Sequence, residues 1–237
     1  MNRFLLMLVA ALAVAVFGGA CQSQDVGEMQ RDSQKIQPKN AQTVRARLLM
    51  GAGELDVTGG ADALMEADFA YNVADWKPDV SYKVSGDTGE LSVKQGSGQG
   101  NRLGGDARNE WDVRFNDEVP TDLRVQMGAG ESALDLDSLA LTGLALEMGA
   151  GKTTVDLTGD YNRDFDASIQ GGVGEATVML PSKVGVRARA RGGLGNINAK
   201  GLKKEGDSYV NDAYGDSDVT LEVDVQGGVG QINLEVV

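Results

Sequence analysis

The sequence predicts an all-β protein, built as a β-solenoid with an antiparallel β subregion near its amino terminus. Three observations support this fold class. A G-x-G pattern recurs six times, apolar and polar residues alternate around each copy, and the chain has 33 glycines but only 4 prolines. Alternation with period two indicates strands with one buried face. A repeat near 20 residues is typical of coils that bury their faces by stacking.

The G-x-G repeat is nearly periodic. Its copies are MGAGE at 50–54 and 127–131, MGAGK at 148–152, GGVGE at 171–175, GGLGN at 192–196 and GGVGQ at 227–231. The second glycine of each copy defines a corner, which gives Gly53, Gly130, Gly151, Gly174, Gly195 and Gly230. The four middle glycines are 21, 23 and 21 residues apart. We therefore expect equivalent corners, one in each coil.

The alternation shifts phase at each corner glycine. In the third copy we expect Met148 and Ala150 to face inward before Gly151, and Thr153 and Val155 after it. The inward step across the glycine is then three residues instead of two, which a residue without Cβ permits at a bulge or corner. Copies with Met before the motif have Ala inside it, whereas copies with Gly have Val or Leu, so we expect size-matched pairs in one core.

Two segments interrupt the period. Residues 61–120 contain four strand-like runs, separated by turn residues, and both tryptophans. They predict the antiparallel subregion, which together with the first coil occupies 43–120 and leaves the stacked coils at 121–237. Residues 203–218, with Tyr209 and Tyr214, form an excursion between the last two coils. A meander or barrel of hairpins also fits the alternation, but gives no reason for identical glycine corners.

The first residues read as a secretory signal. A basic start is followed by an unbroken apolar run, Phe4 to Phe17, which is short for a membrane span. Gly18-Gly19-Ala20 then precedes Cys21, the only cysteine. This arrangement resembles a bacterial lipobox, which implies a signal peptide at 1–20, acylation of Cys21 and a lipid anchor in a membrane. An ordinary signal peptide that leaves a free thiol is the alternative.

The segment after Cys21 is polar and has no apolar period, so we expect residues 21–42 to be the lipidated cysteine and a flexible tether. Gln22 follows the cysteine, and by resemblance to Gram-negative sorting this favours the outer membrane. The domain would then face the periplasm or the cell exterior.

Charge and composition exclude several classes of function. The net charge of −13 argues against nucleic acid as a partner. The chain has no histidine, which removes the usual general base and every Ser-His-Asp or Cys-His arrangement. We expect no catalytic residues and no cofactor.

The stretch EMGAGKTTVDL, 147–157, resembles a nucleotide-binding P-loop only superficially. The P-loop pattern requires glycine at the position of Leu146, and a helix after the lysine to direct its N–H groups at phosphate. Here the residues after Lys152 alternate as a strand does. We expect no nucleotide, and Lys152 as one outward position in a row of polar residues.

Acidic residues offer two further candidate sites. Five carboxylates could converge on one face for glycoside hydrolysis: Asp135, Asp137, Asp156, Asp164 and Asp166. Residues 159–166 and 211–218 could supply oxygen ligands to calcium, although neither has a known calcium-loop spacing. The simpler interpretation of both is a solvated, soluble surface, and we expect no metal.

Three stretches carry a family resemblance: LLMGAGELDVTGG, GGVGEATVMLP and GDSDVTLEVDVQGGVGQINLEV. They resemble the toast-rack family of bacterial envelope proteins, which includes cell-wall-active antibiotic response proteins. The resemblance covers most of 44–237. It implies a single-stranded, right-handed β-solenoid with an amino-terminal β subdomain, and it supplies no catalytic residues. Some relatives act in envelope-stress signalling.

These observations together predict a lipid-anchored, non-catalytic scaffold or interaction module of the envelope, with a link to envelope stress. Its partners would be the membrane, through Cys21, and an envelope protein or a glycan. A carbohydrate-active or glycan-binding protein and an adhesin-like surface protein are the alternatives.

Overall fold

The computed structural model of the chain describes residues 26–97 and 106–237. These residues form strands, turns and one 3-10 turn, Ala74–Trp76, and no helix among them has the length and apolar character to cross a membrane. The all-β solenoid predicted from the sequence is confirmed. The predicted signal peptide and the lipidation site Cys21 lie outside the described residues.

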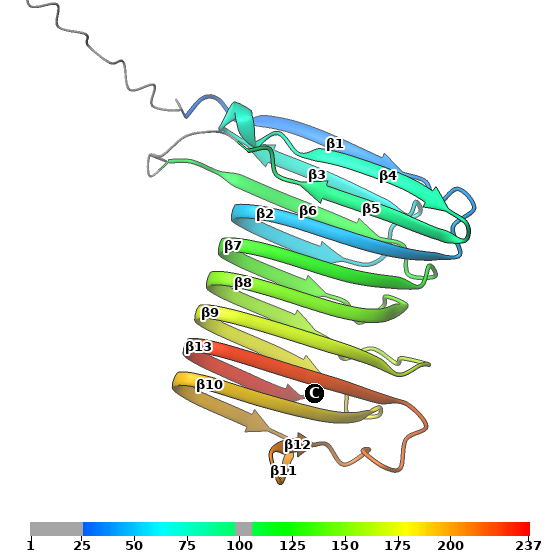
Figure 1. Cartoon of the computed structure of the whole chain (residues 1–237), viewed down its shortest axis with the longest axis vertical. Helices are drawn as coiled ribbons and strands as arrows, with labels where there is room; N and C mark the ends of the chain where they lie inside the picture. Colours follow the sequence, from blue (N-terminus) through cyan, green and yellow to red (C-terminus); the bar gives the residue numbers. More distant parts are fainter. Residues whose placement is uncertain (1–25, 98–105) are drawn as a thin grey trace, which may run out of the picture.

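Six long strands form the stack (Figure 1). They are β2 (Thr43–Thr58), β7 (Thr121–Asp135), β8 (Leu141–Asp156), β9 (Phe165–Leu180), β10 (Gly185–Lys200) and β13 (Thr220–Val236). Each strand bends at its corner glycine into two arms, and each pairs in parallel with its neighbours. The apolar side chains of both arms face each other and form one continuous core.

Shorter strands close the amino-terminal end of the stack. On one arm of β2 lie β6 (Asn109–Phe115), β3 (Met65–Tyr71) and β1 (Gln30–Ile36), and on the other arm lie β5 (Thr88–Lys94) and β4 (Asp79–Ser85). The pairs β3–β6 and β4–β5 are antiparallel, as the sequence predicted for 61–120, and β1 also pairs with β3 in the antiparallel direction. Phe69 and Trp111 pack edge to face in this cap, with ring centroids 5.2 Å apart.

The predicted flexible tether is wrong in its second half. We expected no structure up to residue 42, but Gln30–Ile36 forms β1, paired along its whole length with β3. The sequence of β1 is polar and shows no clear apolar alternation, because β1 is an edge strand whose side chains are only partly covered. Main-chain pairing and an ion pair, Lys35 Nζ to Glu66 Oε1 at 2.6 Å, hold it in place.

The last two coils do not stack in chain order. β13 follows β10 in the chain, but it lies between β9 and β10 in the stack. The chain therefore leaves one position empty after β9, forms β10, turns through the hairpin β11 (Lys203–Glu205) and β12 (Ser208–Val210), and returns to fill the position with β13.

Side-chain bulk accounts for this order. The inward residues of β13 are Leu221, Val223, Val225, Ile232 and Leu234, all buried. The equivalent residues of β10 are Val186, Ala188, Ala190, Ile197 and Ala199, of which the last three are only partly covered or exposed. A strand with neighbours on both edges buries more apolar area, so the bulkier strand gains more from the inner position.

The corner glycines stack directly on one another. Their φ angles lie between 132° and 143°, a region that residues with a Cβ rarely adopt. Neighbouring main chains also approach closely, since a Cβ on Gly151 would lie 1.8 Å from the carbonyl oxygen of Gly130. After the first copy, the first glycine of each motif is constrained as well: a Cβ on Gly149, for example, would lie 2.4 Å from the oxygen of Gly128. In these copies both glycines of G-x-G are therefore required by the close approach of adjacent coils.

The predicted facing of the residue between the two glycines is wrong. The six residues are Ala52, which is partly exposed, and Ala129, Ala150, Val173, Leu194 and Val229, which are exposed. The chain turns around G-x-G so that the whole motif lies on the convex side, and the inward series runs from Met148 directly to Thr153. The size-matched pairs therefore do not share a core, because Met148 is inside and Ala150 outside.

Side-chain amides close the corner at the amino-terminal end, where no previous coil exists. Gln95 Oε1 accepts a hydrogen bond from the backbone N–H of Gly51 at 2.7 Å, and Asn109 Nδ2 donates to the backbone oxygen of Ala52 at 3.0 Å. Asn109 Nδ2 also donates to Gln95 Oε1 at 3.1 Å, and Asn109 Oδ1 accepts from Trp111 Nε1 at 3.0 Å. These buried amides satisfy the main chain that a neighbouring coil would otherwise cover.

Replacing Gly151 with Val should destabilise the fold by at least about 2 kcal/mol, because the new side chain meets both an unfavourable φ and the neighbouring backbone oxygen. Lys152→Ala is the matched control at the adjacent exposed position, and should change the free energy of unfolding by less than about 0.5 kcal/mol. Chemical denaturation of both variants measures this, and equal tolerance would contradict the corner geometry.

Candidate interaction site

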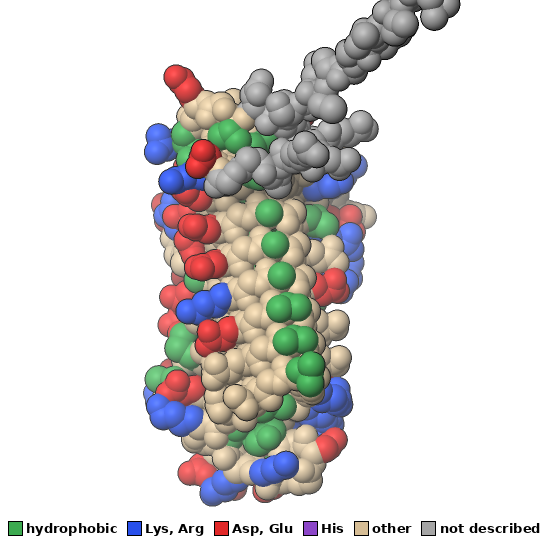
Figure 2. All heavy atoms as spheres, turned by 90° about the vertical axis from the view of Figure 1, so that its left-hand side faces the viewer, with side chains coloured by type: hydrophobic (Ala, Val, Ile, Leu, Met, Phe, Trp, Pro, Cys, Tyr) green, Lys and Arg blue, Asp and Glu red, His purple; other side chains and the backbone are tan. Residues whose placement is uncertain are grey.

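The convex side of the corners carries a continuous apolar ridge, visible as the green column in Figure 2. We call it the corner ridge; in stacking order it consists of Ala52, Ala129, Ala150, Val173, Val229 and Leu194, each paired in register with the next. The side chains grow toward the β10 end, where Leu194 is 72% exposed and Val173 57%. Exposed apolar side chains in a contiguous row are typical of an interaction surface.

A small cavity of about 30 Å³ lies at the corner of the last coils. It exists because Gly171, Gly192 and Gly227 take the place of the methionines of earlier coils, while Ala176 is too small to fill the space. In the earlier coils, buried side chains such as Met148, Ser132 and Thr153 occupy the corresponding space. The hydroxyl oxygens of Ser132 and Thr153 lie 2.7 Å apart. The corner is thus less tightly packed toward the β10 end.

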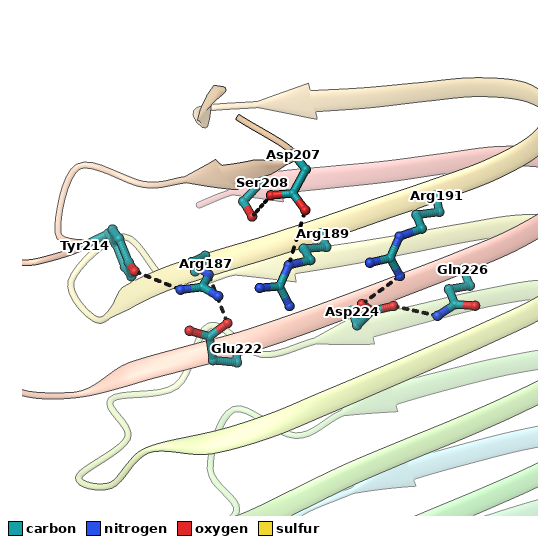
Figure 3. A network of polar contacts seen from close by, with 9 residues as sticks. All are labelled: Arg187, Arg189, Arg191, Asp207, Ser208, Tyr214, Glu222, Asp224 and Gln226. Atoms are coloured by element: carbon teal, nitrogen blue, oxygen red, sulfur yellow. Dashed lines mark hydrogen bonds and ion pairs between the residues drawn. The ribbon is translucent and has the colours of Figure 1, made fainter. Parts of the chain in front are cut away.

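A row of three arginines lies on the outward face of β10 (Figure 3). Arg187 Nε is 3.2 Å from Glu222 Oε2, and Arg191 Nη1 is 3.2 Å from Asp224 Oδ2, both acceptors being on β13. The Tyr214 hydroxyl accepts a hydrogen bond from Arg187 at 3.4 Å, and together with Glu222 it raises the pKa of this guanidinium. β13 therefore supplies the negative charge that the arginines of β10 require.

The middle arginine has a weaker partner. Arg189 Nε is 3.9 Å from Asp207 Oδ2, in the turn between β11 and β12, and the Asp207 side chain is 83% exposed. Separated and solvated pairs of this kind contribute little to stability. Since a guanidinium carries five N–H donors, Arg189 keeps hydrogen-bonding capacity toward an incoming ligand.

The five carboxylates proposed from the sequence do not form one site. Asp135, Asp137 and Asp156 lie close enough to interact, and burial followed by the charges of the other two raises the pKa of Asp137. Tyr161 lies beside them, but its ring is packed against Phe165 and its hydroxyl donates to the backbone oxygen of Leu136 at 3.0 Å. It therefore offers no open platform for a sugar.

The other two carboxylates have separate structural positions. Asp164 accepts a hydrogen bond from the backbone N–H of Thr220 at 2.8 Å and so fixes the start of β13. Asp166 lies on β9 in register with Glu222. In the described part of the chain, no group of three or more acidic residues or cysteines is arranged to hold a metal ion, and this includes the loops at 159–166 and 211–218.

A second acidic surface was not predicted. A hollow of about 380 Å³ lies over β1, β3, β6 and β2, and its lining includes Asp32, Asp68, Asp112 and Asp56. Asp68, Asp112 and Asp56 are directly opposite one another on successive strands. Burial and the charge of Asp112 raise the pKa of Asp56, so the row carries a cost to stability. The strand order, which a single sequence does not contain, brings these residues together.

One family model and several solved structures are similar to this chain. The family model described as the N-terminal domain of toast_rack, DUF2154, matches residues 25–179. The solved structure of a candidate cell adhesion protein from Clostridium sporogenes is 35% identical, with a TM-score of 0.87, and the match covers 89% of this chain and 100% of that chain. A candidate adhesin from Bacteroides fragilis matches at 11% identity over 89% and 97% of the two chains, with a TM-score of 0.28. No curated protein matches the chain.

The raised pKa of Asp137 gives a testable pH dependence. The folded state holds this proton more tightly than the unfolded state, whose value is near 3.8, so stability falls as the pH rises through the interval above that value. Asp137→Asn should therefore reduce the fall in Tm between about pH 4 and pH 6. Asp216→Asn, at an exposed loop carboxylate, is the control. Identical pH profiles for Asp137→Asn and the unmodified protein would contradict the clustering.

Proposed function

We propose that this chain, which belongs to the toast-rack family, is a non-catalytic scaffold of the bacterial cell envelope that binds a partner through its solenoid. The single observation that carries the proposal is the corner ridge, an exposed and unbroken apolar row that the stacking maintains over six coils. The described relative is a candidate cell adhesion protein that the match covers completely, and this supports an adhesin-like surface role.

The proposed anchor is a lipid on Cys21. Since β1 is the first strand and lies at the end of the stack opposite β10, a short tether would hold the β1 end near the membrane. The corner ridge would then extend away from the bilayer, and its last two residues in stacking order, the exposed Val229 and Leu194, would be the most distant ones. A role in sensing or transmitting envelope stress belongs to the same proposal.

The alternative is a glycan-cleaving or glycan-binding protein. The grouping of Asp135, Asp137 and Asp156 favours it, because two carboxylates suffice for glycoside hydrolysis. Against it, the hydroxyl of Tyr161 is already bonded to the backbone oxygen of Leu136, and its ring is packed against Phe165. We therefore give preference to the scaffold.

One experiment tests the anchor and the binding role together. The full-length protein should incorporate a fatty-acid analogue and fractionate with membranes, and Cys21→Ala should lose both properties. Chemical cross-linking of the protein in intact cells should capture a binding partner. This cross-link should be lost when Val229 and Leu194 are both replaced by Ser, and retained in the exposed control variant Lys152→Ala. Label that persists in Cys21→Ala contradicts the anchor. Cleavage of cell-wall glycan that is lost in Asp135→Asn or Asp156→Asn contradicts the non-catalytic role.

A further inference from the structure

The two ends of the stack are finished differently. At the amino-terminal end, β2 is covered on both arms, and the amides of Gln95 and Asn109 close its corner. At the other end, β12 pairs with β10 only at Arg187 and Ala188. No strand among the described residues pairs with the outer edge of β10 from Arg189 to Lys200. The last coil therefore presents a free strand edge that bends around the corner (Figure 1).

The hydrogen-bonding groups of this edge can be assigned from their neighbours. Val186 directs both of its backbone groups outward, since its N–H donates to Asn211 Oδ1 at 2.9 Å and its oxygen accepts from the N–H of Asn211 at 3.3 Å. Alternate residues of a strand in a parallel pair point to the same side. Ala190 and Gly192 therefore also direct their N–H and C=O groups outward, but without a partner strand.

The inner edge of β10 shows which sequence fits against it. There the chain places Glu222, Val223, Asp224 and Val225 of β13, so that carboxylates face the arginines and aliphatic side chains enter the core. On the outer edge, the same arginine row remains available through Arg189, whose present acidic partner is distant and exposed. A strand added here would extend both the ladder of backbone hydrogen bonds and the alternation of charge and apolar contact.

We propose that the outer edge of β10, Arg189 to Lys200, binds an extended segment of a partner protein in which acidic and aliphatic residues alternate. The segment adds as one more strand, its carboxylates beside Arg189 and Arg191 and its aliphatic side chains beside Ala190 and the exposed Leu194 and Ile197. This inference rests on the proposed role as an interaction module and names the partner's chemistry. A second copy of the chain is the competing occupant, but it would bring the arginine row of β10 against basic residues of the same strand.

The chain itself supplies the probe. A fluorescently labelled peptide with the sequence TLEVDVQ, identical to 220–226, should bind the full-length protein in detergent. The dissociation constant is measured by fluorescence anisotropy. The matched control peptide TLKVKVQ reverses the two charges and should bind at least about tenfold more weakly, because it places lysines beside arginines. Backbone NMR shifts should change in 189–200 of β10.

Two protein variants test whether the peptide binds at the outer edge of β10 and not elsewhere on the molecule. Ala190→Pro removes one outward N–H and leaves the pairing with β13 intact, and Arg189→Glu reverses the charge; each should weaken peptide binding at least about tenfold. Thermal unfolding checks that both variants fold. The exposed substitution Lys152→Ala should bind as the unmodified protein does.

The outcomes separate this inference from the proposed function. Equal binding of both peptides, or binding unchanged in Ala190→Pro and Arg189→Glu, overturns the edge site. Capture of an envelope partner that survives both substitutions overturns it too, while leaving the scaffold role intact. Self-association detected by sedimentation and abolished by Ala190→Pro would assign the edge to a second copy and overturn the proposed partner.

Discussion

The close contact of main chain on main chain at the G-x-G corners determines the rest of the structure. Each corner glycine lies in register with the next, and adjacent coils are too close for any Cβ at this position. The bend has to occur at the equivalent residue of every coil, because a side chain at this residue would push two coils apart. The parallel register, the shared core between the arms and the straight corner ridge all follow from this contact.

This architecture places potential binding groups on surfaces and edges instead of in a deep pocket. The core is filled by side chains of both arms, so the features open to a partner are the outward residues, the corner ridge and the free edge of the last coil. The described residues bring no more than three of the five predicted carboxylates together, beside a tyrosine whose hydroxyl is already bonded. The proposed scaffold, to whose exposed edge a partner strand would be added, uses these outward features.

Much of the fold could be predicted from the sequence. The recurrence of G-x-G and the period of two gave the coils, their corners and the antiparallel cap, and the toast-rack resemblance is confirmed by the family match. The outward facing of Ala150 could not be read from alternation, because the chain turns through four residues at the corner. Either β10 or β13 could pair with β9, and only the greater bulk of inward residues such as Leu221 and Leu234 indicates that β13 takes this position. β1 was missed because an edge strand is held by backbone pairing and leaves little apolar pattern.

Residue-level hydrogen exchange in the native protein tests the central claim, a stack in which β13 is enclosed and β10 is the open end. Amides along both arms of β13 should all exchange slowly, whereas in β10 protection should alternate, with Arg189 and Arg191 slow and Ala190 and Gly192 fast. The opposite pattern, with continuous protection in β10 and alternating protection in β13, would mean that the coils stack in chain order and would contradict the account.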